Sequence, residues 1–285
     1  MTEPGAGSSR ASLASREAVG VLGAGRMGRP IIGHLVRAGY PTLVFDPSQD
    51  TRSAVEERGA RFTADPRQIA AECAVVLVCV GYEEQVTALM NGEAALLEAM
   101  RPGTVVAVLS TISPAQMTSL AKAATGSGVH LIDAPVCRGG GAADRGELLS
   151  FAGGPADVVE QITPVLRAYS ADVVRTGDVG TGQVAKAANN MILWACLVAD
   201  HEALALATSY GVDLEALRAA LLTSSAANTA LANWGRQTMA WAEDDMHIVA
   251  GMAAEAGLAL PQSGVNREIC RALKPRRYQL DEYGH

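Results

Sequence analysis

The stretch from Ala18 to Gly28 reads Ala-Val-Gly-Val-Leu-Gly-Ala-Gly-Arg-Met-Gly, and it decides the fold of the first part of the chain. Its first five residues form a short apolar run that predicts a strand, and the residues after Gly28 follow a helical pattern. A GxGxxG pattern alone also occurs in ordinary turns. Between a strand and a helix it has the context of a dinucleotide-binding fingerprint.

Each glycine of this pattern has a predicted role. Gly23 allows a tight turn, Gly25 lets the backbone approach a pyrophosphate, and Gly28 lets the helix pack closely on the strand. The phosphates would meet free N–H groups at the start of the helix. Arg26 and Met27 lie in the same turn, so we assign them to the cofactor as well.

Asp46 ends the next predicted strand, 42–46, and lies 23 residues after Gly23. An acidic side chain there can accept hydrogen bonds from the ribose hydroxyls of NAD and repels the 2'-phosphate of NADP. NAD is therefore the predicted cofactor. The alternative is a surface Asp that starts a turn before Pro47. We also assign Val80, at the end of a strand predicted over 74–80, to the cofactor site.

Strands and helices alternate up to about residue 181, and only helical patterns follow. This order predicts an α/β fold, with a doubly wound parallel sheet of the Rossmann type followed by an all-helical domain. We predict a disordered tail over 1–17, the dinucleotide-binding domain over 18–181 and a helical substrate and dimerisation domain over 182–285. The predicted strands are 18–22, 42–46, 60–63, 74–80, 104–109, 129–133, 148–151 and 172–175. The first predicted helix follows Gly28 and ends at Ala38 and Gly39, and the others are 51–58, 114–124, 155–168, 183–210, 213–222, 228–241, 244–256 and 262–273.

Composition restricts the class of function. The chain has 285 residues, 49% of them hydrophobic, and a net charge of -7, which argues against nucleic acid or an anionic membrane as a partner. The apolar segment 184–199 carries a lysine and two asparagines near its start, so we expect no membrane span. Five cysteines without a CxxC pair suit reduced thiols in the cytoplasm, and neither they nor the five histidines form a metal signature.

The stretch Gly180–Asn190 begins the long helical pattern and contains one strong base, Lys186, among apolar residues. A helix that is apolar all round is normally buried on several sides, and burial would lower the pKa of a lysine toward the range useful for proton transfer. Asn190 lies four residues later, on the same face. Two interpretations of this stretch remain open: an acid/base pair, or a snorkelling lysine with an asparagine on a packed helix.

Four motifs together resemble the β-hydroxyacid dehydrogenase family, which includes 3-hydroxyisobutyrate dehydrogenases and the tartronate semialdehyde, glyoxylate and sulfolactaldehyde reductases. The resemblance covers about residues 18 to 273. The motifs are Gly23–Gly28, Ser110–Pro114, Asp133–Val136 and Gly180–Asn190.

The resemblance implies NAD-dependent hydride transfer between nicotinamide and a small β-hydroxy acid or the matching aldehyde acid. It implies that Lys186 is the general acid/base, that Asn190 orients the reacting oxygen, and that Thr111 borders both nicotinamide and substrate. The segment after Val136 would hold the anionic end of the substrate.

Two departures from the family pattern concern the substrate. Where the family usually has Ser-Gly-Gly, this chain has Cys137, Arg138 and Gly139, so a poor hydrogen-bond donor replaces the serine and a guanidinium is added. Arg138 and Gly139 are predicted to hold a carboxylate, sulfonate or phosphate; alternatively Arg138 faces solvent or binds a carboxylate such as Asp144.

The second departure is Asp244, which replaces a lysine of the family's Lys-Asp-Leu pattern. We place Asp244 at the substrate site, where its charge would disfavour an anionic ligand or favour a cationic one. A shift in our alignment would instead leave it in an acidic helix N-terminus.

Two other functions are compatible with the pattern. An imine reductase has the same two-domain plan but usually lacks the lysine, and a non-catalytic dinucleotide-binding scaffold tends to lose it. Because Lys186 is present, we favour the dehydrogenase. The long apolar helix predicts a homodimer or a higher homo-oligomer.

Overall fold

The structure is a computed structural model that describes residues 17–236, 239–275 and 279–282. The tail predicted over 1–17 lies outside this part, apart from its last residue. The chain divides into two compact units, Met1–Val184 and Ala185–His285, and each is described by itself.

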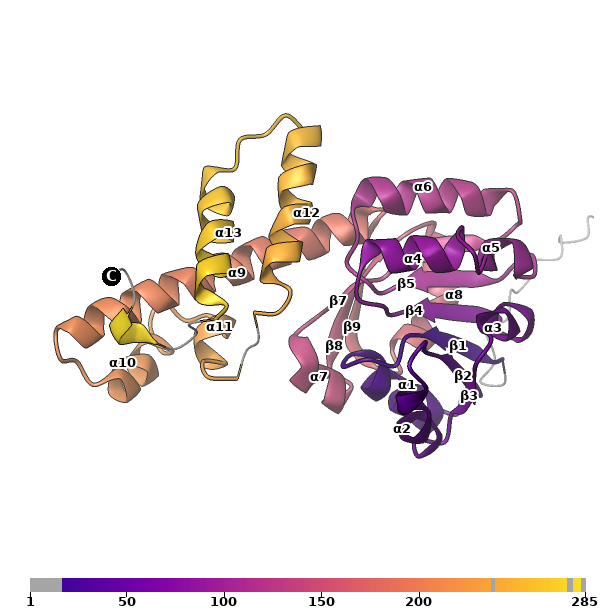
Figure 1. Ribbon diagram of the computed structural model, residues 1–285, viewed down its shortest axis with the longest axis horizontal. Coiled ribbons are helices and arrows are strands. Elements are labelled where there is room, and N and C mark those ends of the chain that lie inside the picture. The colour runs from indigo at the N-terminus through magenta and orange to yellow at the C-terminus, as the bar shows by residue number, and fades with distance from the viewer. Residues whose placement is uncertain (1–16, 237–238, 276–278, 283–285) are drawn as a thin grey trace, which may run out of the picture. The chain divides into compact units, whose positions relative to one another are not determined.

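The first unit is built on one sheet of nine strands in the order β3-β2-β1-β4-β5-β6-β8-β7, with β9 paired to β8 (Figure 1). The first six strands in this order are all parallel to their neighbours. The strands are β1 (Val19–Leu22), β2 (Thr42–Phe45), β3 (Arg61–Thr63), β4 (Val75–Val78), β5 (Val105–Val108), β6 (His130–Asp133), β7 (Val136–Cys137), β8 (Leu148–Gly153) and β9 (Ser170–Gly177).

Helices cover both faces of this sheet, because alternate residues of the buried strands point to opposite sides. Val75 and Leu77 join one apolar cluster, and Val76 and Val78 join the other. The first cluster contains residues of α1 (Gly28–Arg37), α2 (Arg52–Glu56), α7 (Gly139–Arg145) and α8 (Ala156–Leu166). The second contains residues of α3 (Pro66–Glu72), α4 (Glu83–Met90), α5 (Leu96–Ala99) and α6 (Pro114–Thr125). The predicted fold class is confirmed.

The far end of the sheet differs from the parallel sheet that the sequence predicted. Strand β8 runs antiparallel to both β6 and β7, and only β9 is parallel to it. A parallel neighbour needs a crossover of a dozen or more residues. Between Cys137 and Leu148 there is room only for the seven-residue helix α7, so the chain reverses direction.

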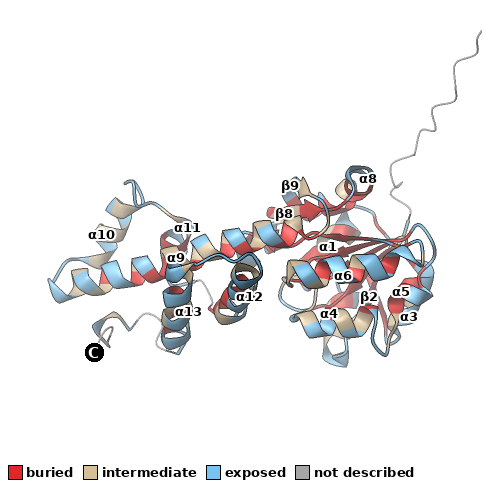
Figure 2. Cartoon of the chain, turned by 90° about the horizontal axis from the view of Figure 1, so that it is seen from above, coloured by how far each residue is buried: buried red, intermediate tan, exposed pale blue. Residues whose placement is uncertain are grey.

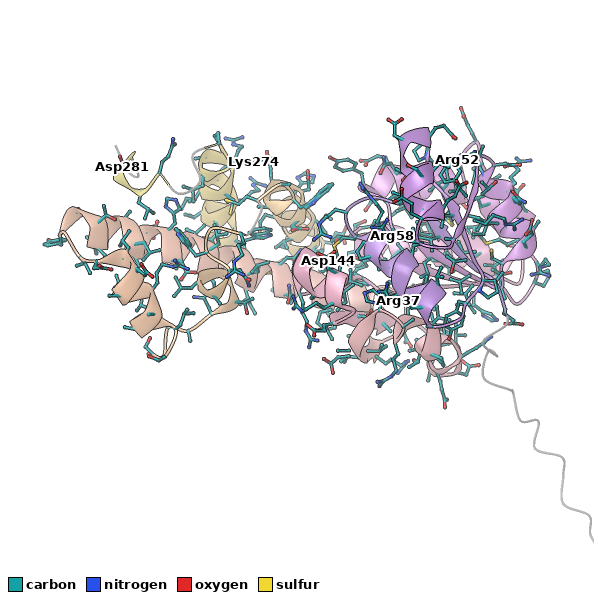
Figure 3. All side chains as sticks on the ribbon, turned by 90° about the horizontal axis from the view of Figure 1, so that it is seen from below. Arg37, Arg52, Arg58, Asp144, Lys274 and Asp281 are labelled. Carbon is teal, nitrogen blue, oxygen red and sulfur yellow. The ribbon has the colours of Figure 1, made fainter. Side chains whose placement is uncertain are left out.

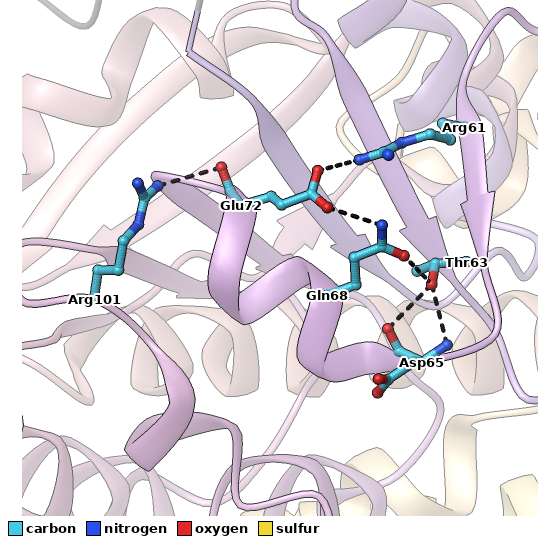
Figure 4. A network of polar contacts seen from close by, with 6 residues as sticks. All are labelled: Arg61, Thr63, Asp65, Gln68, Glu72 and Arg101. Atoms are coloured by element: carbon cyan, nitrogen blue, oxygen red, sulfur yellow. Dashed lines mark hydrogen bonds and ion pairs between the residues drawn. The ribbon is translucent and has the colours of Figure 1, made fainter.

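At the other end of the sheet from β7, a network of polar contacts connects the edge strand β3 to helix α3 (Figure 4). Glu72 forms an ion pair with Arg61 and accepts a hydrogen bond from Gln68, which in turn accepts one from Thr63 at 2.7 Å. These contacts lower the pKa of the Glu72 carboxyl, the bond from Gln68 most. Arg101 donates to the Glu72 carbonyl oxygen. The network holds the edge strand β3 against α3.

The second unit contains only helices among its described residues. Four of these helices contribute buried side chains to one core, among them Trp194, Leu197 and Met246. The helices are α9 (Thr181–Ser209), whose first turns belong to the first unit, α10 (Leu214–Leu221), α11 (Thr229–Ala232), α12 (Ala242–Glu255), α13 (Pro261–Leu273) and η2 (Leu280–Glu282). Helix α11 is much shorter than the predicted 228–241, of which 237–238 lie outside the description. It ends at Ala232, and Gly235, three residues later, has a left-handed backbone with φ of 88°.

Helix α9 is long and apolar enough, by length and composition alone, to cross a membrane, with a mean hydropathy of 1.4 in its most apolar window. Only 28% of that window is buried within the chain. Exposed residues alternate with buried ones along it (Figure 2). The expectation of a helix buried on several sides is therefore not met: Ile192 and Leu206 are 67% and 62% exposed.

Candidate active site

The glycine turn between β1 and α1 has the geometry that its sequence predicted. Gly23 has a φ of 107°, and a Cβ added there would lie 2.3 Å from the Cys79 carbonyl oxygen. A Cβ on Gly28 would lie 2.1 Å from the Gly23 carbonyl oxygen, so Gly28 allows the helix to pack against the turn itself. Beside Gly25 there is open space.

The N-terminus of α1 is suited to an anion. Its cap residue, Met27, makes no side-chain hydrogen bond to the first turn, and that turn has no acidic residue. Backbone N–H groups at such a helix end carry a partial positive charge and lack partners within the helix. With the open space at Gly25, this end fits a dinucleotide pyrophosphate.

Asp46 follows β2 directly and its carboxylate is fastened to the glycine turn. Oδ2 accepts a hydrogen bond of 2.7 Å from the Ala24 N–H, and Oδ1 accepts one of 2.9 Å from the Ser48 N–H. Each carboxylate oxygen can accept more than one bond, so Asp46 keeps capacity for ribose hydroxyls. The half-buried side chain therefore both shapes the turn and fits an adenosine ribose.

Arg26 lies in the same turn, but its guanidinium faces helix α7. It binds Asp144 with two parallel hydrogen bonds of 2.9 and 2.7 Å. The hydrogen bond to Asp144 raises the pKa of Arg26, and the same pair lowers the pKa of Asp144. Both groups are more than half exposed, so the pair contributes little to stability.

His34 adds a second connection between α1 and α7. Its Nδ1 lies 2.8 Å from a nitrogen of Arg37, which can only donate, so its Nε2 carries the proton and donates to the Ala143 carbonyl oxygen at 3.0 Å. Figure 3 labels Arg37 on α1 and Asp144 on α7. The cofactor turn and the segment predicted to hold substrate are thus joined directly.

Val80 and Thr111 lie after β4 and β5, at the same edge of the sheet as the glycine turn and Asp46. The Ser110 hydroxyl accepts from the Val80 N–H and donates to the Val80 carbonyl oxygen, both at 2.9 Å. The adjacent Thr111 is half-buried. The sheet order β2-β1-β4-β5 therefore brings together these predicted cofactor residues, at the carboxyl ends where open α/β sheets bind ligands.

The segment after β6 carries the predicted substrate residues of this unit. Cys137 is buried in β7, and Gly139 is exposed at the start of α7. Arg138 has a left-handed backbone with φ of 83°. Its guanidinium donates to Asp172 at 2.6 Å and to the Glu147 carbonyl oxygen at 3.1 Å. The carboxylate bound by Arg138 is thus Asp172, since Asp144 binds Arg26.

Lys186 and Asn190 lie on α9, in the second unit. Lys186 is half-buried, less than the sequence suggested, and Asn190 is 3% exposed. A carboxylate that the sequence had not singled out lies beside them. Asp245 on α12 accepts a hydrogen bond from Trp194 at 3.0 Å, is also hydrogen-bonded to Asn190 and is attracted by the charge of Lys186.

Asp245 is almost fully buried, whereas Asp244 beside it is exposed. Burial raises the pKa of the Asp245 carboxyl, and Lys186 gives the largest opposing effect. The sequence predicted Asp244 as the substrate-site carboxylate and assigned no role to Asp245. Within the described residues, no group of three or more His, Cys, Asp or Glu side chains is arranged to hold a metal ion.

Comparison with known proteins gives the family. Residues 18–177 match the NAD binding domain of 6-phosphogluconate dehydrogenase, and residues 180–282 match a domain described as NAD-binding of NADP-dependent 3-hydroxyisobutyrate dehydrogenase.

Two relatives and one solved structure support this assignment. The chain is 34% identical to the probable mitochondrial 3-hydroxyisobutyrate dehydrogenase of Dictyostelium discoideum, over 75% of this chain and 67% of the relative. It is 30% identical to the 2-(hydroxymethyl)glutarate dehydrogenase of Eubacterium barkeri, over 88% and 87%. The 3-hydroxyisobutyrate dehydrogenase structure from Salmonella typhimurium superposes with a TM-score of 0.82 at 26% identity, covering 92% of this chain and 95% of that one. The chain therefore belongs to the β-hydroxyacid dehydrogenase family, a family of NAD(P)-dependent oxidoreductases.

Proposed function

We propose that this chain catalyses the NAD-dependent oxidation of a small acid with a primary hydroxyl β to a carboxylate, or the reduction of the matching aldehyde acid. The grouping of Lys186 and Asn190 around the buried carboxylate of Asp245 carries the proposal. The two relatives named above add support, because 3-hydroxyisobutyrate and 2-(hydroxymethyl)glutarate both contain this hydroxyl and carboxylate.

The preference for NAD rests on Asp46. Its carboxylate fits ribose hydroxyls and would repel a 2'-phosphate, while the open turn at Gly25 and the N-terminus of α1 fit the pyrophosphate. Val80 and Thr111 would border the cofactor at the neighbouring strand ends. NAD, when bound, accepts the hydride from the carbon that bears the hydroxyl.

Lys186 is the proposed general base in the oxidative direction. Its unprotonated amine accepts the hydroxyl proton, and in the reductive direction the ammonium returns it. Asn190 orients the hydroxyl oxygen. The Asp245 carboxylate stabilises the ammonium that forms on Lys186, since an opposite charge nearby favours the charged form.

The anionic end of the substrate is the proposed ligand of Arg138 and the Gly139 backbone. Arg138 is paired with Asp172, so a substrate carboxylate would have to compete with that side chain. The buried Cys137 would line the site without donating a strong hydrogen bond.

A homodimer is the proposed assembly. The apolar side chains exposed along α9, with Ile192 and Leu206 foremost, form a surface that a second copy can cover. We propose this in place of a membrane span, because residues 180–282 match the C-terminal domain of a dehydrogenase family.

The experiment is turnover of the full chain with NAD or NADP. The panel consists of 3-hydroxyisobutyrate, 2-(hydroxymethyl)glutarate, a β-hydroxy amine and buffer alone. Lys186→Ala should lower kcat by about two to four powers of ten while NAD still binds by calorimetry. Lys122→Ala is the control, because Lys122 is exposed on α6. Near-normal turnover of Lys186→Ala would disprove the mechanism, and oxidation of the amine alone would favour an imine reductase.

A further inference from the structure

The first turn of α9 is held by a carboxylate that lies far away in the sequence. Asp133, the last residue of β6, is fully buried. Its Oδ1 accepts a hydrogen bond of 2.7 Å from the Gly180 N–H, and its Oδ2 accepts one of 2.9 Å from the Gln183 N–H. The Gly182 N–H also bonds to it. Asp133 thus performs for α9 the capping function that a neighbouring residue performs in most helices.

Two glycines leave just enough room for this carboxylate. A Cβ added to Gly153 would lie 2.5 Å from Asp133 Oδ1, and one added to Gly182 would lie 2.7 Å from Oδ2. The Asp133 carboxylate is therefore tightly enclosed between Gly153 of β8 and Gly182 of α9, and this close fit fixes the capped turn against β6 and β8. Burial raises the pKa of Asp133, and the bonds from the backbone N–H groups act in the opposite direction.

Gln183 extends this attachment to the segment that carries Thr111. Its side chain is 1% exposed. Oε1 accepts from the Ile112 N–H at 3.1 Å, and Nε2 donates to the Ser110 carbonyl oxygen at 2.9 Å. The Gln183 side-chain amide accepts one hydrogen bond and donates one, as a peptide group of an adjacent strand would. It thereby fixes the backbone on both sides of Thr111.

The same chain of bonds reaches the cofactor residues. Ser110 is bonded through its hydroxyl to both backbone groups of Val80. The path Val80, Ser110, Gln183 and Asp133 thus links the ends of β4, β5 and β6 to the first turn of α9. Every step of this path is a hydrogen bond of 3.1 Å or less.

We infer that Gln183 and Asp133 are positioning residues for the proposed reaction, because they fix the first turn of α9, which leads into Lys186, to the ends of β5 and β6. This inference rests on the proposed function. Lys186 follows Gln183 by three residues in one continuous helix, so a shift of the first turn is transmitted to it. Neither residue is assigned any contact with reacting atoms, and small misplacements of a catalytic group are enough to lower turnover.

The main test is Gln183→Met, which keeps the side-chain length and removes both hydrogen bonds. We expect kcat on 3-hydroxyisobutyrate to fall by about 10- to 100-fold, with the Kd for NAD within about threefold of the original. Gln116→Met is the matched control: Gln116 also makes a side-chain hydrogen bond, to Thr87 of α4, and its loss should leave kcat unchanged.

A double variant separates positioning from general destabilisation. In the Lys186→Ala background, Gln183→Met should lower kcat by less than about threefold, because the group it positions is already absent. An equal loss in both backgrounds, or an unchanged kcat of Gln183→Met alone, would overturn the inference.

Hydrogen exchange supplies a readout that does not depend on turnover. In Gln183→Met the Ile112 amide should exchange faster than in the original chain, and the Gly180 amide, which Asp133 still binds, should not. Unchanged Ile112 exchange would overturn the attachment itself. If the original chain oxidises no acid of the panel, the proposed function is wrong and the positioning role is wrong with it. If the original chain is active and Gln183→Met leaves its kcat unchanged, only the positioning role is wrong.

Discussion

Trp194 Nε1 donates a hydrogen bond of 3.0 Å to Asp245 Oδ2, and this bond joins α9 to α12 over 51 residues of sequence. Both side chains are at least nine-tenths buried. The bond gives a buried carboxylate one of its few donors and fixes it beside Lys186 and Asn190. A buried charge without such partners would be costly. The pair therefore couples the stability of the helical unit to the candidate catalytic group.

The first prediction concerns Asp245→Asn and pH. Burial raises the pKa of Asp245 above its ordinary value of 3.8, so the folded state holds a proton that the unfolded state has released. The stability contributed by this proton is complete below pH 3.8 and is lost as pH rises through the folded pKa. The Asn variant does not titrate, so its stability relative to the original chain should improve over this window and then level off.

Tryptophan fluorescence during urea unfolding can measure this difference at a series of pH values. All three tryptophans, Trp194, Trp234 and Trp241, lie in the helical unit, so the signal reports on that unit. Glu255→Gln is the control for removal of a carboxylate, because Glu255 is exposed at the end of the same helix and is not among the groups that shift the pKa of Asp245. A stability difference that is flat between pH 3.5 and 7 would contradict the prediction.

The second prediction separates the two partners of Arg138. If Arg138 binds the substrate carboxylate, Arg138→Ala should raise KM for 3-hydroxyisobutyrate about tenfold, which corresponds to a charged hydrogen bond of about 1.5 kcal/mol. Asp172→Ala should lower KM or leave it unchanged, since it removes the carboxylate that competes for the guanidinium. Initial rates at saturating NAD measure both values. If neither variant alters KM, Arg138 serves only the exposed ion pair with Asp172.

The third prediction concerns the choice of cofactor. Asp46→Ala should lower the ratio of kcat/KM for NAD over NADP by about tenfold or more, because it removes both the ribose acceptor and the repulsion of a 2'-phosphate. Asp46→Asn keeps an acceptor for the Ala24 N–H, so it tests the charge without disturbing the turn. Asp50→Ala is the control on the exposed 3-10 turn that follows β2. An unchanged ratio in both Asp46 variants would assign the selection to other residues.

The sequence predicted the first half of the sheet well, because each strand there is a short apolar run with a clear boundary. It missed four helices, α3, α4, α5 and α7. The start of α3 did carry a signal: Asp65 caps the helix through the Arg67 N–H, and Pro66 occupies its first position. The sequence of helix α7 carried little signal, since it begins with three glycines. The helix depends instead on contacts with α1 and the turn before it.

The candidate site was predictable where its chemistry lies in one motif, and not where it depends on distant partners. The glycine turn and Asp46 belong to one local unit, so their contact follows from the pattern. The contact of Asp245 with Trp194, and that of Gln183 with Ser110, join residues 51 and 73 positions apart. Periodicity and spacing along the chain contain no information about such pairs.

The last prediction concerns assembly. An apolar stripe on α9 that the chain itself leaves uncovered would be unfavourable in water, and a second copy can bury it. We therefore expect the chain to have twice the mass of a monomer, or a higher multiple, by light scattering after gel filtration. Ile192→Glu combined with Leu206→Glu should reduce the mass toward that of a monomer, because two carboxylates cannot be buried in an apolar interface without partners.

The control is Leu258→Glu, which introduces one carboxylate at a leucine that is 61% exposed, close to the 62% of Leu206, but lies after α12 and outside α9. Its mass should equal that of the original chain, since a charge on a surface outside the interface leaves association intact. A loss of mass in both the double variant and the Leu258→Glu control would indicate general destabilisation. A monomeric original chain would instead mean that the apolar face of α9 serves a partner other than a second copy.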